Sequence, residues 1–166
     1  MARKINIVVA LALLMVIAAG CKKNDWLDWK VQNQLILEAN KEKYKDDPKF
    51  HVTESGLQYY IESDEYQHES KPHDESLVIC DYELRLPANK NRVLDKGEYA
   101  SIPLVNAVPG FTEGVKKIHN HGVIKLWVPY DLGYGEDGYG SEGYKTHIPP
   151  YTTLYFRVNL RGVTNY

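Results

Sequence analysis

The side chains most often used in covalent or metal-dependent chemistry are sparse in this 166-residue chain. Its two cysteines, Cys21 and Cys80, stand far apart, so the sequence predicts neither a disulfide framework nor a paired-cysteine zinc site. Cys80 belongs to an alternating apolar run, which predicts a buried structural thiol rather than a nucleophile. His119 and His121 have no further ligand residues close by, and this pattern favours a solvated turn over a metal site.

Phosphate binding and serine hydrolysis also lack their motifs. The sequence has no Gly-Lys-Ser/Thr phosphate loop and no Gly-x-Ser-x-Gly nucleophile turn. The glycine-rich stretch from Gly133 to Gly143 carries acidic residues that would repel phosphate, so we expect a flexible rim there. A formal net charge of −2 offers no basic surface to nucleic acid, and no cofactor is expected.

Three blocks rich in proline and aromatic residues remain. They are residues 108–114 (VPGFTEG), 128–135 (VPYDLGYG) and 148–156 (IPPYTTLYF). The stretch from Tyr130 to Tyr155, which includes most of the last two blocks, is rich in tyrosine. The blocks offer apolar surface and hydroxyl groups but no acid–base pair.

Apolar residues that alternate with a period of two predict the strands that position these blocks. The clearest strand spans residues 76–86, with Val78, Cys80, Tyr82, Leu84 and Leu86 on its inner face. Residues 153–163 alternate in the same way, and weaker strands are expected at 57–61, 92–104 and 123–128.

A short helix is predicted between these strands. Pro109 suits its first turn, and Phe111, Val115 and Ile118 share its inner face. The sequence therefore predicts an α+β domain in which about five antiparallel strands pack on this helix. A further helix is expected before the sheet, from Asn24 or Asp25 to about Tyr44. It would pack on the domain or act as a spacer, and a dimerisation helix is the alternative.

The N-terminus is typical of an export signal. Arg3 and Lys4 precede an uncharged run from Ile5 to Ala19, which is shorter than the ~20 residues that span a bilayer. Small residues then lead into Cys21, which resembles a bacterial lipobox and implies cleavage before Cys21 and lipid attachment to its sulfur. An uncleaved apolar anchor and an ordinary signal with an incidental cysteine are the alternatives.

The three blocks, in this order and at this spacing, resemble the FKBP-type peptidyl-prolyl cis-trans isomerases. The resemblance runs from about Val52 to Val163, and residues 52–59 (VTESGLQY) look like the lead-in of exported members. It implies a curved antiparallel sheet wrapped on one short helix. The implied organisation is a signal peptide at 1–20, a lipidated helical segment at 21–50 and an isomerase domain at 51–166.

The resemblance also assigns the residues of a pocket. Catalytic positions fall on Tyr82, Asp95 and Tyr134. Substrate-binding positions fall on Leu94, Val108, Phe111, Ile148 and Phe156. Three positions depart from the family pattern: Leu94 stands where Phe is usual, Phe111 replaces Trp, and Ala100 lies near a position that is usually larger. These departures predict an active but slower enzyme.

Isomerisation of an X-Pro bond needs no nucleophile, base or metal, because its barrier of ~18–20 kcal/mol comes from amide resonance. An apolar pocket favours the twisted amide over the planar one. The resemblance gives the carbonyl-orienting role to the Ile148 N–H and the Tyr134 hydroxyl, with Asp95 and Tyr82 ordering the pocket.

The implied partners are unfolded or Pro-containing polypeptides, macrolide-type inhibitors, and a membrane of the bacterial cell envelope reached through lipid on Cys21. A non-catalytic module that grips Pro-containing peptides is the alternative function. A structural lipoprotein with a collapsed pocket is a third.

Overall fold

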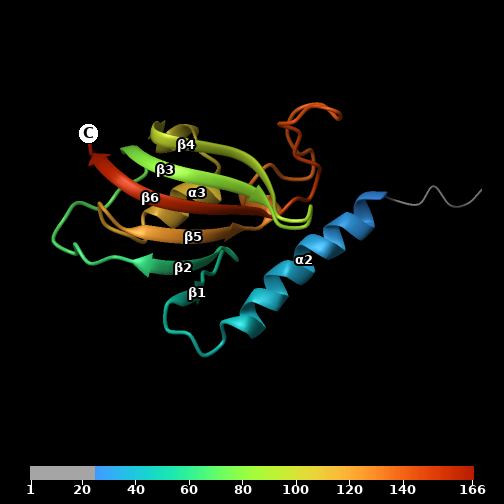
Figure 1. Cartoon of the computed structure of the whole chain (residues 1–166), viewed down its shortest axis with the longest axis horizontal. Helices are drawn as coiled ribbons and strands as arrows, with labels where there is room; N and C mark the ends of the chain where they lie inside the picture. The colour runs from blue at the N-terminus through green and yellow to red at the C-terminus, as the bar shows by residue number, and fades with distance from the viewer. Residues whose placement is uncertain (1–24) are drawn as a thin grey trace, which may run out of the picture.

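A single antiparallel sheet dominates the computed structural model, which describes residues 25–166 (Figure 1). The sheet has six strands in the order β1-β2-β5-β6-β3-β4. The strands are β1 (Phe50–Val52), β2 (Gln58–Ser63), β3 (Leu77–Leu86), β4 (Arg92–Pro103), β5 (Val123–Val128) and β6 (Leu154–Thr164). The helices are α2 (Asp25–Lys43) and α3 (Pro109–Val115), with single turns η1 (Leu104–Asn106) and η2 (Tyr130–Leu132).

The predicted α+β class and the strand order along the chain are confirmed. The strand beyond the expected five is β1, whose three residues are too few to show an alternating pattern. The helix α3 ends at Val115, earlier than the apolar spacing indicated, and Ile118 is buried just beyond it.

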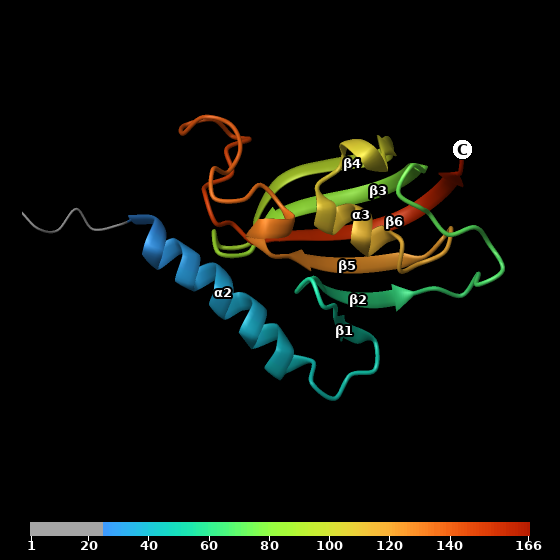
Figure 2. The same ribbon diagram turned by 180° about the vertical axis from the view of Figure 1, so that it is seen from behind.

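The core lies between α3 and one face of the sheet, which Figure 2 shows from the side of the helix. The inward residues of β3 and β6 alternate as predicted, from Val78 to Leu86 and from Leu154 to Leu160. Gly114 lets α3 approach β5 closely, because a Cβ atom there would overlap the side chain of Leu126. The close approach fixes the helix over the middle of the sheet.

The helix α2 packs on the domain through buried polar groups. Asn33 is 1% exposed, and its Oδ1 accepts a hydrogen bond from the Thr153 N–H at 2.7 Å. Gln58, also 1% exposed, donates from Nε2 to the Leu37 carbonyl at 2.9 Å. The apolar residues Leu27, Val31 and Leu35 face solvent instead. Hydrogen bonds therefore join this helix to the sheet, beside the half-buried side chains of Trp29, Ile36 and Leu37.

None of the helices within residues 25–166 is both long and apolar enough to cross a membrane. The predicted signal at 1–20 and the lipidation residue Cys21 lie outside the described residues.

Candidate active site

A cavity of about 280 Å³ opens between α3 and the strands β3, β4 and β6. Its wall combines aromatic, aliphatic and a few polar side chains. The lining residues are Tyr82, Leu84, Asp95, Ile102, Asn106, Ala107, Val108, Phe111, Tyr134 and Phe156. The structure thus brings together every predicted pocket residue except Leu94 and Ile148.

Two apolar rings form the floor of this cavity. Phe111, on the first turns of α3, meets Phe156 of β6 edge to face, with ring centroids 5.3 Å apart. Both rings are almost fully buried. Phe111 reaches this position because Val108 stays extended before the helix and Pro109 supplies its first residue.

A hydrogen-bonded pair stands at one side of the cavity. The Tyr82 hydroxyl of β3 donates to Asp95 Oδ2 of β4 at 2.6 Å, while Asp95 Oδ1 accepts the Lys96 N–H at 2.9 Å. Burial, and then the bond to Asp95, raise the pKa of Tyr82 to about 12. The phenol therefore keeps its proton and serves as the donor, which fixes the carboxylate at the cavity mouth.

Tyr134 brings a further hydroxyl to the wall of the cavity. Its ring lies 5.0 Å from that of Tyr139, and burial, followed by Tyr139 and Asp95, raises its pKa. No hydrogen bond among residues 25–166 uses the Tyr134 hydroxyl. This proton is available to a carbonyl oxygen in the cavity.

Val108, rather than Ile148, has a backbone N–H without a partner among residues 25–166. The Ile148 N–H donates to the Tyr139 carbonyl at 2.9 Å, and the Ile148 side chain is buried in the core, away from the cavity. By contrast, the Val108 N–H has no partner within the described part of the chain, and Val108 lines the cavity. Ile148 contributes instead by closing the loop that carries Tyr134.

Leu94 and Ala100 are displaced from the wall by irregularities in β4. Leu84 pairs with Asp95 and Arg85 with Val93, so Leu94 is the extra residue of a β-bulge. It packs half-buried against the core, outside the lining. Ala100 pairs with Cys80, and the wall position that the sequence placed near Ala100 is occupied by Ile102.

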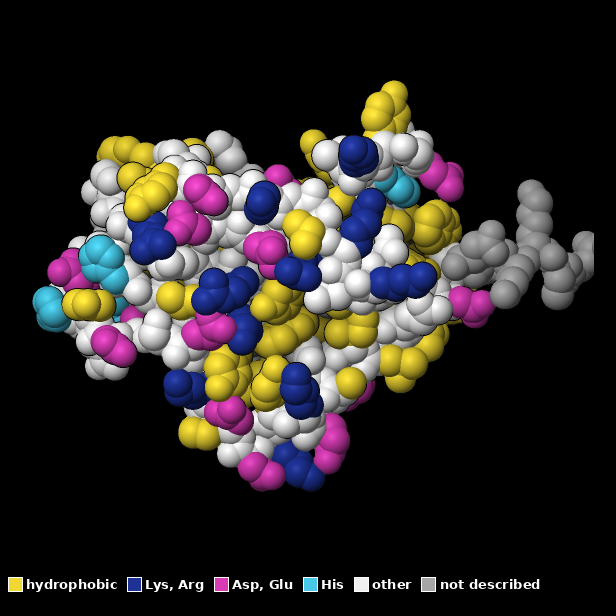
Figure 3. Space-filling view, in the orientation of Figure 1, with side chains coloured by type: hydrophobic (Ala, Val, Ile, Leu, Met, Phe, Trp, Pro, Cys, Tyr) yellow, Lys and Arg dark blue, Asp and Glu magenta, His cyan; other side chains and the backbone are white. Residues whose placement is uncertain are grey.

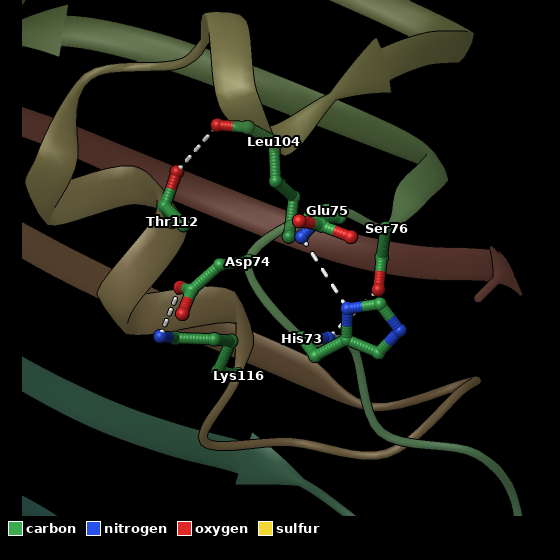
Figure 4. A network of polar contacts seen from close by, with 7 residues as sticks. All are labelled: His73, Asp74, Glu75, Ser76, Leu104, Thr112 and Lys116. Atoms are coloured by element: carbon green, nitrogen blue, oxygen red, sulfur yellow. Dashed lines mark hydrogen bonds and ion pairs between the residues drawn. The ribbon is translucent and has the colours of Figure 1, made fainter. Parts of the chain in front are cut away.

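A polar network holds α3 beneath the cavity (Figure 4). The Thr112 hydroxyl donates to the Leu104 carbonyl at 2.9 Å, which ties α3 to η1. Lys116 pairs with Asp74, and the Leu104 N–H donates to the Ser76 carbonyl at 3.0 Å, so the segment before β3 joins the same network. These bonds fix the chain from Asn106 to Val108, which forms the rim of the cavity.

The remaining candidate groups are accounted for structurally. Cys80 is fully buried, and burial raises the pKa of its thiol to about 12, which suits a structural role. His119 is not the solvated turn residue that the sequence indicated, because its Nδ1 lies 2.9 Å from Asp64 Oδ2. Across residues 25–166 no three His, Cys, Asp or Glu side chains gather into a metal site.

Comparison with known proteins agrees with this arrangement. The sequence profile of the FKBP-type peptidyl-prolyl cis-trans isomerases matches residues 68–161. The chain is 34% identical over 136 residues to the FKBP-type isomerase FkpA of Aeromonas hydrophila, covering 81% of this chain and 46% of that protein. It is 33% identical over 125 residues to FkpA of Escherichia coli K12, covering 74% of this chain and 43% of that protein.

The fold agrees as well. The crystal structure of FkpA from Escherichia coli superposes with a TM-score of 0.71 at 27% identity, covering 97% of this chain and 74% of that one. The antiparallel sheet, the short helix and the aromatic cavity between them define an α+β domain with a small ligand cavity. Within that class, this chain belongs to the FKBP-type peptidyl-prolyl cis-trans isomerase family. It spans about half the length of the curated relatives that it matches.

Proposed function

We propose that this protein catalyses cis–trans isomerisation of X-Pro peptide bonds. The observation that carries the proposal is the cavity itself, in which an apolar floor of Phe111 and Phe156 faces two free donors, the Tyr134 hydroxyl and the Val108 N–H. Its volume of about 280 Å³ accommodates a proline ring and the adjoining peptide group.

The apolar floor would act on the resonance of the bond. A planar amide has large charge separation and is well hydrated, whereas a twisted amide has lost resonance and part of its charge separation. Transfer from water into the space over Phe111 and Phe156 therefore costs the planar form more than the twisted form. Such a difference between ground and transition states lowers the barrier.

The donors would orient the carbonyl as it turns. The Val108 N–H and the Tyr134 hydroxyl flank the floor and have no partner elsewhere in residues 25–166. A carbonyl that rotates toward them gains hydrogen bonds that water no longer supplies in the cavity. Asp95, held by Tyr82, stands at the mouth and is placed to order the substrate chain.

Direct measurement of exchange tests this proposal. Two-dimensional NMR exchange spectroscopy on several X-Pro peptides that differ before the proline would show cross-peaks growing with protein concentration. Uncatalysed exchange takes ~10–100 s at 25 °C, so catalysis is readily separated from background. If the folded protein bound these peptides without accelerating exchange, the non-catalytic binding module would replace the enzyme.

We further propose that the protein acts on exported polypeptides in the bacterial cell envelope, anchored by lipid on Cys21. The support is the charged start, the apolar run and the small residues before Cys21. In a bacterial host, Cys21→Ser should leave an unprocessed precursor or release the protein from the membrane fraction. Unchanged processing and unchanged fractionation of that variant would overturn the anchor.

A further inference from the structure

The face of the sheet opposite α3 has a depression of about 470 Å³ directly behind Tyr82. Tyr82 lines both this depression and the catalytic cavity. Figure 3 shows basic and acidic side chains interspersed over this face of the molecule. One of its acidic residues, Asp81, is the neighbour of Tyr82 on β3 and points to the opposite side of the sheet.

The two strands beside β3 both contain an extra residue next to Asp81. On β4, the partners of Cys80 and Tyr82 are Ala100 and Gly97, so the interval is one residue longer than on β3. On β6, successive residues of β3 pair with Gly162 and Leu160, which leaves Arg161 as the extra residue. Asp81 therefore lies between a β-bulge on β4 opposite it and a β-bulge on β6 opposite the two residues before it on β3.

The Asp81 carboxylate is bonded to both bulges. Its Oδ1 accepts the Tyr99 N–H at 2.9 Å, while its Oδ2 accepts from Arg161 Nε at 2.8 Å and lies 2.7 Å from Nη2. Tyr99 has a φ of 50°, an unfavourable value for a residue with a side chain. The charge-assisted bond from Asp81 offsets that strain.

The bulge on β4 decides what lies beneath Tyr82. It places Gly97 opposite Tyr82, and a Cβ atom on Gly97 would stand only 2.6 Å from Tyr82 Cε1. The aromatic ring fills the space that any other side chain would occupy. In this position its hydroxyl reaches Asp95, two residues before Gly97 on the same strand.

We propose that Asp81, oriented by Arg161, is a positioning residue for the Tyr82–Asp95 pair. It acts from the far face of the sheet by holding the Tyr99 bulge, which keeps Gly97 under the Tyr82 ring. The assignment rests on the proposed isomerase function only in its kinetic consequence, because the placement of Tyr82 can be measured without turnover.

The test uses protein labelled with 3-fluorotyrosine, in which loss of one ¹⁹F resonance in Tyr82→Phe assigns the Tyr82 signal. Asp81→Ala should move that signal toward the position of exposed tyrosines. It should also lower kcat about tenfold while KM changes less than about twofold. The reason is that the contacts of Asp81 order the Tyr82–Asp95 pair, which acts while the X-Pro bond rotates. Asp81→Asn keeps an oxygen acceptor for Tyr99 and should restore most of the signal position and of kcat.

Glu83→Ala is the matched control. Glu83 is the next outward acidic residue of β3, its ion pair is with Arg85, and none of its hydrogen bonds or ion pairs within residues 25–166 involves Tyr99 or Arg161. Its removal should leave the Tyr82 signal and kcat unchanged. Equal effects of Asp81→Ala and Glu83→Ala, or a Tyr82 signal that Asp81→Ala does not move, would overturn the proposal.

A measurement on the unmodified protein covers the case in which Asp81→Ala does not fold. The Tyr99 side chain is 71% exposed, yet its N–H should exchange with deuterium markedly more slowly than an unstructured amide because Asp81 accepts it. Exchange at the unstructured rate would contradict the proposal. If the protein had no isomerase activity but the Tyr82 signals behaved as expected, the proposed isomerase function would be refuted. The role of Asp81 in positioning the Tyr82–Asp95 pair would still hold.

Discussion

Ile148 and Tyr139 exchange two backbone hydrogen bonds, with N–O distances of 2.9 Å and 2.8 Å. This bridge closes the long loop between η2 and β6 and places Tyr139 against the Tyr134 ring. It also occupies the Ile148 N–H, whereas the Val108 N–H and the Tyr134 hydroxyl have no partner among residues 25–166.

Tyr134→Phe separates the role of that hydroxyl from the role of the ring. Because the hydroxyl has no partner in the described structure, the free energy of unfolding should change by less than ~0.5 kcal/mol. Loss of one bond to the turning carbonyl, worth ~0.5–1.5 kcal/mol, should lower kcat/KM about 2- to 13-fold. Tyr139→Phe is the control, since it removes a neighbouring hydroxyl outside the cavity. Full activity with lower stability would contradict the assignment.

Ile102→Phe tests the wall of the cavity. A ring at this position adds apolar surface against the proline, and a few tens of Å² at ~25 cal/mol per Å² correspond to about 1 kcal/mol, or several-fold in kcat/KM. The family pattern predicts the same gain for Leu94→Phe, but Leu94 lies in the bulge beside the lining. We therefore expect the larger gain from Ile102→Phe in a peptide exchange assay. The reverse order would place residue 94 in the cavity.

Asn33→Ala tests how α2 is attached. The substitution leaves the buried Thr153 N–H without its acceptor, which should lower the free energy of unfolding by ~1–3 kcal/mol in urea titrations. Gln34→Ala, one residue along on the exposed face, should change it by less than ~0.5 kcal/mol. Equal effects of the two substitutions would mean that the amide of Asn33 does not support the domain.

Cys80 should make the protein less stable in alkali. Its pKa is raised to about 12 in the fold, whereas a thiol in the unfolded chain ionises near ~8.5. Between these values the unfolded state binds fewer protons, so stability falls as pH rises, at most by ~1.4 kcal/mol per pH unit. Urea titrations under reducing conditions from pH 8 to 10 should show the free energy of unfolding of the wild type falling steadily relative to that of Cys80→Ala. A constant difference would rule out this contribution.

The regular part of the site could be predicted from the sequence. Tyr82 and Phe156 lie on strands whose uninterrupted alternation assigns them to the inner face. Phe111 lies on a helix whose start is set by Pro109. In each case a local pattern decides the direction of the side chain, and the structure confirms it.

The remainder depends on interactions between distant segments. The bulge at Leu94 removes that residue from the cavity wall, and Ile102 rather than Ala100 lines the cavity, which no period in β4 alone indicates. The pairing of Ile148 with Tyr139 similarly depends on how a loop closes. The sequence predicts that α2 packs on the domain or acts as a spacer, but it does not indicate that the buried amides of Asn33 and Gln58 hold the helix.

The amide contacts of α2 also determine how the domain responds to force. A helix held by apolar contacts alone can shift by one turn with little loss of binding energy. Asn33 and Gln58 each bond to specific partners, and these hydrogen bonds would break if α2 shifted. A pulling force applied at Asp25 would therefore pass through α2 to Thr153 and to β2 without the helix shifting on the sheet. The orientation of the cavity relative to Asp25 is fixed in the same way.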